Sequence, residues 1–207
     1  PEARERMRFQ DAAPDARHIV YATIQADPLV GRAADLIAAG SAGERILARA
    51  VMNGDRSDPA TWRAIFPTLF GPAADPSLRA HAEAVLAVSL EVAGKGEATR
   101  SQYRDAIVEH LTEAILRRRC AAVRRERRIL FDGVRAEIHP YDVTVEGGAA
   151  AEAYDCKWGA RGINADVLDQ LDGARRNAAA EGERLTAALV VFDARRSCLV
   201  QIGRAHV

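Results

Sequence analysis

The most constraining feature of the sequence is an eight-residue segment, 185–192, that reads Leu-Thr-Ala-Ala-Leu-Val-Val-Phe. A short and almost wholly apolar run of this kind is typical of a strand that is buried on both faces. The segment before it, 164–181, places apolar residues at helical spacing, through Val167, Leu168, Leu171 and Ala174. The sequence therefore predicts an α/β fold in which helices flank a central sheet.

The region before residue 164 supplies the other strands. From Ile129 the apolar pattern changes from helical to strand period, and we expect strands at 129–131, 134–145 and 151–158. Asp132-Gly133 and Gly147-Gly148 are expected turns. A final edge strand is expected at 198–202. The longest helical pattern precedes these strands and runs from Glu97 to about Arg127. The predicted order is thus helix, three strands, helix, strand.

Residues 1–96 predict a different kind of structure. After a polar lead-in at 1–15, helical patterns cover 15–26, 28–39, 41–52, 61–70 and 76–92, with Asp27-Pro28 as the start of the second helix and Gly40 as its end. No motif in this region carries chemistry. We interpret 1–96 as an all-helical N-terminal region, either a cap or a targeting or partner-binding module, and 97–207 as a second domain.

Composition excludes several classes of protein. The formal net charge is zero, so any nucleic-acid binding must use local basic patches. The three cysteines lie far apart, without the spacing of a zinc site or a disulfide framework. No apolar run approaches the length of a membrane span, and residues 1–9 lack the apolar core of a signal peptide. We expect a cytoplasmic protein with no membrane partner.

The segment 153–158 carries the most distinctive chemistry. Strand geometry puts Asp155 and Lys157 on one face, because side chains two residues apart point the same way. The chain has 27 arginines and only two lysines. A lysine at this position therefore indicates that a compact, titratable amine is required there rather than a guanidinium group. The alternative without function is that Asp155 and Lys157 form an exposed ion pair on an edge strand. Such a pair contributes little to the stability of the folded chain. An unpaired carboxylate is costly in an apolar strand, so Asp142, within Tyr-Asp-Val-Thr-Val, is harder to explain in this way.

Asp142, followed by Asp155-x-Lys157 and then by a helix carrying Gln170, resembles the PD-(D/E)xK nuclease superfamily, the restriction-endonuclease-like fold. The resemblance covers about residues 100–202, and it implies a central mixed sheet flanked by helices. Two positions depart from the family pattern. Tyr141 stands where the motif has proline, and Ala174 stands where some exonuclease-like branches have tyrosine.

The resemblance implies a Mg²⁺- or Mn²⁺-dependent deoxyribonuclease. Asp142, Asp155 and the backbone carbonyl of Cys156 would be the metal ligands, and Lys157 would position the attacking water. Some members add a glutamate from the first core helix, for which Glu109 is our first choice and Glu113 the alternative. The implied partner is nucleic acid, first of all double-stranded DNA, with an endonuclease role in bacterial defence or DNA processing. A homodimer or a partner subunit is also compatible with this resemblance.

An arginine-rich stretch is the candidate for contacts with phosphate. Guanidinium groups suit phosphate oxygens, and the same charges near a helix end also balance the helix dipole. The candidate contacts with nucleic acid are Arg117, Arg118, Arg124, Arg125 and Gln170.

Two other functions stay open at the level of sequence. One is a catalytically weak nucleic-acid-binding or assembly module that keeps the nuclease-like fold. The other is a helical interaction protein, which would require that residues 129–202 form no mixed sheet.

Overall fold

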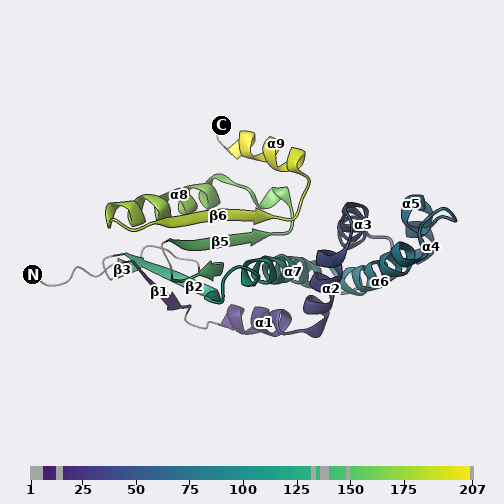
Figure 1. The fold of residues 1–207 in the computed structure, drawn as a ribbon, viewed down its shortest axis with the longest axis horizontal. Coiled ribbons are helices and arrows are strands. Elements are labelled where there is room, and N and C mark those ends of the chain that lie inside the picture. Colours follow the sequence, from purple (N-terminus) through teal and green to yellow (C-terminus); the bar gives the residue numbers. More distant parts are fainter. Residues whose placement is uncertain (1–6, 13–15, 132–133, 136–139, 148–149, 206–207) are drawn as a thin grey trace, which may run out of the picture. The chain divides into compact units, whose positions relative to one another are not determined.

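The computed structural model describes residues 7–12, 16–131, 134–135, 140–147 and 150–205 (Figure 1). The chain forms two compact units. The helical unit is Ala16–Leu111, and the sheet unit combines Pro1–Asp15 with Thr112–Val207. This division differs from the predicted boundary at residue 96, because the longest helix begins in one unit and ends in the other.

The helical unit is built from short amphipathic helices. They are α1 (Ala16–Gln25), α2 (Pro28–Ala39), α3 (Ala42–Asn53), α4 (Pro59–Ile65), α5 (Pro67–Phe70), α6 (Pro76–Ala93) and the first part of α7 (Glu97–Arg117). The predicted start of α2 is confirmed, since the Asp27 side chain accepts the Leu29 N–H at 2.8 Å and Pro28 is the first helical residue. The predicted helix at 61–70 is wrong. It divides into α4 and α5 at Phe66, because the following Pro67 disfavours a helical conformation in the residue before it.

The core of the helical unit lies where α2 and α3 pack against α6. Its members are aliphatic side chains with almost no exposure to solvent, among them Val30, Ile37, Leu47, Val51, Val85 and Leu86. Apolar burial of this kind is the main stabilising contribution to a small helical domain.

The sheet unit contains a mixed sheet. Its strands are β1 (Arg8–Asp11), β2 (Val123–Phe131), β3 (Val134–Arg135), β4 (Tyr141–Val145), β5 (Ala151–Lys157) and β6 (Leu185–Val191). Their order is β1-β2-β4-β5-β6, with β3 paired to β2. All pairings are antiparallel except β5 with β6, which is parallel. A parallel pair needs a crossover, and α8 (Ala165–Ala180) supplies it.

Helix α8 covers part of this sheet (Figure 1). Its apolar stripe, Leu171, Ala174 and Ala178, packs in one buried cluster with Ala153 of β5 and Ala187 of β6. Small side chains on both elements let the helix approach the strands closely. The predicted α/β class, with a mixed sheet flanked by helices, is confirmed.

The sequence misplaced three segments. Helix α7 ends at Arg117, and the residues expected to continue it form β2 instead, because pairing with β1 and β4 overrides local helical preference. Residues 8–11, expected as a loose lead-in, form β1. The expected edge strand at 198–202 lies within helix α9 (Arg195–Ala205), since a short apolar run does not by itself distinguish the two periods. The expected turns at 132–133 and 147–148 lie wholly or partly outside the described residues.

Candidate functional site

Strand register aligns three acidic residues across the sheet. Val143 of β4 lies opposite Tyr154 of β5, so the next step along the same register sets Asp142 against Asp155. On the other side of β4, the pairs Arg125–Val143 and Arg127–Tyr141 leave Glu126 of β2 across from Asp142. Three neighbouring strands therefore each place an acidic residue at one level of the sheet.

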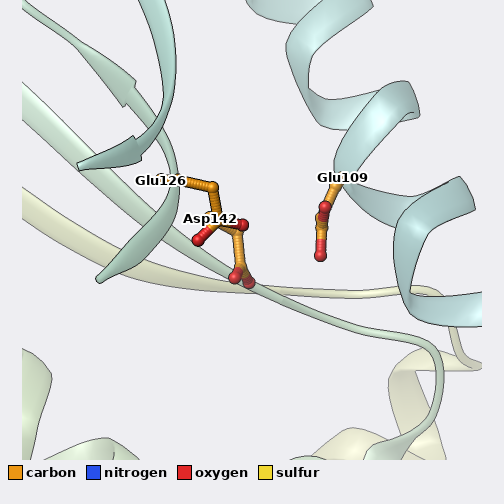
Figure 2. A group of neighbouring side chains, drawn as sticks. All are labelled: Glu109, Glu126 and Asp142. Atoms are coloured by element: carbon orange, nitrogen blue, oxygen red, sulfur yellow. The ribbon is translucent and has the colours of Figure 1, made fainter. Parts of the chain in front are cut away.

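Glu126 and Asp142 form a close pair. One oxygen of each lies within 4.8 Å of the other, and Figure 2 shows the two side chains next to each other. Both residues are half-buried. Asp142 also accepts the backbone N–H of Cys156 through Oδ2, at 2.6 Å, which ties its carboxylate to β5. Two carboxylates at this separation repel each other unless a cation or a proton lies between them, and oxygen donors of this kind suit Mg²⁺ or Mn²⁺.

Glu126 has an unusual backbone. Its φ is 52°, and it is the only described residue other than glycine with a positive φ. The left-handed region is costly for a side chain with a Cβ, and such strain persists where the surrounding structure enforces it. The strain coincides with the carboxylate pair, as often occurs at functional sites.

Asp155 and Lys157 form a separate pair on β5. Their Oδ1 and Nζ atoms are 3.6 Å apart, and the two side chains are 13% and 32% exposed. Cys156, between them in sequence, points to the opposite face, where its buried Sγ contacts Thr112 Oγ1 at 3.4 Å. Among the described residues, Asp155 does not join Glu126 and Asp142 within 4.8 Å. The structure thus brings Asp142 together with Glu126, and Asp155 does not join them in one group of three carboxylates.

The Lys157 side chain is confined by the turn that follows β5. Gly162 ends the 3₁₀ turn η1 (Ala160–Gly162), and a Cβ added there would lie 2.7 Å from Lys157 Cγ. Asp193 anchors the same turn by accepting the Ala160 N–H at 2.9 Å, and the Phe192 N–H donates to the Lys157 carbonyl at 3.0 Å. Sequence reasoning missed these residues, because the close approach of Gly162 to Lys157 arises only in the folded chain.

The two helical glutamates have different surroundings. Glu109, also labelled in Figure 2, belongs to the helical unit, where its buried carboxylate accepts hydrogen bonds from Tyr21 and, at 2.7 Å, from Gln25. Glu113 forms ion pairs with Arg125 at 2.6 Å and with Arg117 at 2.7 Å. Two arginines therefore neutralise Glu113.

The arginines predicted to contact nucleic acid do not form one cluster. Arg117 and Arg125 are held by Glu113, whereas Arg124 is exposed and donates to a backbone carbonyl. Arg118 is exposed on the turn after α7, and no ion pair involves it within the described part of the chain. Gln170 is half-buried on α8.

Next to this stretch, an ion pair joins the end of α7 to β5. Arg119 donates to both oxygens of Glu152, at 2.8 Å for the longer bond. These bonds lower the pKa of Glu152. Burial, assisted by a hydrogen bond to Glu152, raises the pKa of Tyr154 to about 12. The trio is therefore charge-balanced near neutral pH and serves a structural role.

Comparison with known proteins finds no match among protein families, curated proteins or solved structures. Within the described residues, none of the helices combines the length and apolar character that crossing a membrane requires.

Proposed function

We propose that this protein is a metal-dependent nuclease that hydrolyses phosphodiester bonds of DNA. The observation that carries the proposal is the row formed by Asp142 on β4 and Asp155 on β5, with Lys157 on the same face as Asp155. The order α7, β2, β4, β5, α8, β6, with the two-residue β3 between β2 and β4 and the short η1 before α8, supports it. Helix, three strands, helix, strand is the order of the PD-(D/E)xK core that the motif resembles.

Glu126 and Asp142 are the carboxylates best placed to hold a divalent cation. Their oxygens are close enough to share one ion, and they supply the hard donors that Mg²⁺ and Mn²⁺ prefer. When bound, such an ion polarises the scissile phosphate and stabilises the charge that develops on it. Asp155 and the Cys156 carbonyl remain predicted ligands from the neighbouring strand.

Lys157 is the residue proposed to handle the attacking water. Its Nζ would donate a hydrogen bond to the water and offset negative charge on the phosphate in the transition state. Asp155, 3.6 Å away, keeps the ammonium oriented, while Gly162 restricts the path of the aliphatic stem. A lysine held on both sides in this way loses little conformational entropy when substrate binds.

Glu109 is proposed as a third carboxylate on the resemblance alone, because some members of that superfamily add a glutamate from the first core helix. Helix α7 carries Glu109 within the helical unit, where its carboxylate accepts hydrogen bonds from Tyr21 and Gln25.

The test is cleavage of supercoiled and linear DNA, and of RNA, by the full chain with Mg²⁺ or Mn²⁺. We expect metal-dependent cutting of DNA that falls at least about a hundredfold in Lys157→Ala, Asp155→Asn and Asp142→Asn. Glu109→Gln and Glu126→Gln show whether the glutamate predicted on the helix and the glutamate found in the structure contribute to cleavage. Asp172→Asn, an exposed acid on α8, is the matched control and should cut normally.

Each outcome of this test is distinct. Cutting that persists in Lys157→Ala and Asp155→Asn would place the activity elsewhere. DNA binding without cutting would favour the alternative, a nucleic-acid-binding module with a nuclease-like fold.

A further inference from the structure

A basic pocket lies at the carboxyl ends of the two parallel strands. Strands β5 and β6 end in register at Lys157 and Val191, and the chain then forms η1 after one strand and α9 after the other. Between η1 and α9 is a pocket of about 420 Å³. Sheets of this kind commonly bind ligands just beyond the carboxyl ends of parallel strands.

Three arginines define the chemistry of this pocket. Arg161 comes from η1, and Arg196 and Arg204 come from α9. All three are exposed, and no ion pair to a carboxylate involves any of them in the ranges that the structure describes. Ser197 and Gln201, which add neutral hydrogen-bonding groups to the lining, recur with the arginines at helical spacing. One face of α9 therefore lines this pocket.

Helix stability explains Arg204, a cation in the last turn of α9, but it does not explain Arg196. Arg196 lies in the first turn of α9, which contains no acidic residue, and a cation there opposes the helix dipole. The one acid in the lining, Asp193, already accepts the backbone N–H groups of Ala160 at 2.9 Å and Ala194 at 2.6 Å. The Asp193 carboxylate therefore shapes the pocket, and the guanidinium groups dominate the charge of the pocket.

The pocket is built on the residues that hold Lys157. Arg161 precedes Gly162, the residue packed against the lysine stem, and Gln201 donates to the Ile163 carbonyl at 3.2 Å, which fastens α9 to the same turn. The turn that carries Arg161 therefore also packs against Lys157.

We propose that this pocket binds a phosphate of the nucleic-acid strand next to the one that is cleaved, and thereby sets the strand across Lys157. The inference rests on the proposed function, since a strand at Lys157 is its premise. Guanidinium groups bind phosphate oxygens in forked pairs of hydrogen bonds, which fixes the orientation of the strand as well as its position. Contacts of this type carry no sequence information.

The experiment measures binding in the absence of cleavage. The full chain with Asp155→Asn, in EDTA, is titrated into fluorescein-labelled single-stranded and double-stranded DNA, and anisotropy is followed at several salt concentrations. Arg161→Gln, Arg196→Gln and Arg204→Gln are compared singly and together. Arg175→Gln and Arg176→Gln, two exposed arginines of α8, are the matched controls.

We expect each pocket substitution to weaken binding about threefold to tenfold and to lower the salt slope by about one, while the α8 controls bind normally. Undiminished binding by the triple variant, or a total lack of DNA binding, would overturn the inference. So would binding to anionic lipid vesicles in place of DNA, an alternative suggested by the exposed Leu199 and Ile202 on α9. If binding depends on the arginines but the native chain cuts nothing with Mg²⁺, the pocket remains a phosphate-binding site and only the nuclease is refuted.

Discussion

At the scale of single residues, Glu126 and Asp142 link charge to stability. Their oxygens lie within 4.8 Å, so without a cation the pair repels, and a bound cation should stabilise the folded chain. At a Mg²⁺ concentration tenfold above its Kd, mass action predicts about 1.4 kcal/mol of added stability.

We therefore expect Mg²⁺ to raise the Tm of the native chain and to have little effect on Glu126→Gln, which removes one charge of the pair. In EDTA the variant should be at least as stable as the native chain, because the repulsion is gone. Differential scanning calorimetry with and without Mg²⁺ measures both effects. An equal response of Glu126→Gln and the native chain would show that the pair does not hold the ion.

Gly162 makes a second prediction at this scale. A Cβ at this position would meet Lys157 at Cγ and at Cβ, at 2.7 and 2.8 Å, so the lysine stem or the turn must move. Gly162→Ala should lower DNA cleavage by about tenfold or more and cost about 1–3 kcal/mol through overpacking. At Gly159 the nearest atom to an added Cβ is Asp193 Oδ2 at 3.8 Å, an ordinary contact. Gly159→Ala is thus the control, and equal losses in both variants would contradict a positioning role for Gly162.

Asp142, Asp155 and Lys157 were predictable because a short motif places them on two strands, whatever the rest of the fold does. Glu126 was not, since the sequence around it, Arg-Arg-Glu-Arg-Arg, reads equally well as the charged end of a helix. Only the register of β2 against β4 sets it across from Asp142. The positive φ of Glu126 could not be predicted, because a glutamate in a sequence gives no indication of this conformation. The packing of Gly162 against Lys157 could not be predicted either, since it depends on a tertiary contact.

At the scale of elements, α8 and β6 could be predicted from the sequence, whereas β1 and α9 could not. Helix α8 and strand β6 form where the sequence predicts them, because a long amphipathic pattern and a short apolar run bounded by turns are clear signals. The expectation that β6 is buried on both faces is wrong, since β6 lies at the edge of the described sheet and Ala187 is its one buried residue. Strand β1 exists only through its pairing with β2, and a four-residue polar segment carries no such signal. Helix α9 is short and has no buried residue among those that the structure describes, so its apolar content did not reveal its period.

The ion pair between Arg119 and Glu152 predicts how the link between α7 and β5 responds to acid. Hydrogen bonds from Arg119 hold the pKa of Glu152 below its ordinary 4.5, so the unfolded chain takes up the proton at a higher pH than the folded one. The stabilisation is therefore fully present above about pH 4.5 and is lost as the pH falls through the pKa of the folded state.

Glu152→Gln should accordingly lower the Tm by about 1–3 °C at pH 7 and make progressively less difference as the pH falls below 4.5. Thermal melts of the native chain and the variant across this range test the prediction, with the exposed Asp172→Asn as the control. A difference that grows toward acid pH would contradict it.

At the scale of the whole molecule, the helical unit has a core of its own. Helices α2 and α3 pack on α6 within Ala16–Leu111, and their buried aliphatic side chains contact one another. A segment of this size with its own core should fold independently. The sheet unit differs, because β1 comes from the N-terminus and the other strands from the second half of the chain.

We expect residues 16–117, which keep α7 whole, to fold alone into a helical domain that unfolds cooperatively. Leu47, fully buried on α3, provides the test of packing. Leu47→Ala should destabilise this fragment by about 2–5 kcal/mol, because the substitution removes buried methyl groups and leaves a cavity. Ile46→Ala, at a position that is 59% exposed on the same helix, should have a much smaller effect. Circular dichroism during urea unfolding measures all three proteins. A gradual loss of helix without a cooperative transition would show that the helical unit needs the sheet unit to fold, and the two would then be one domain.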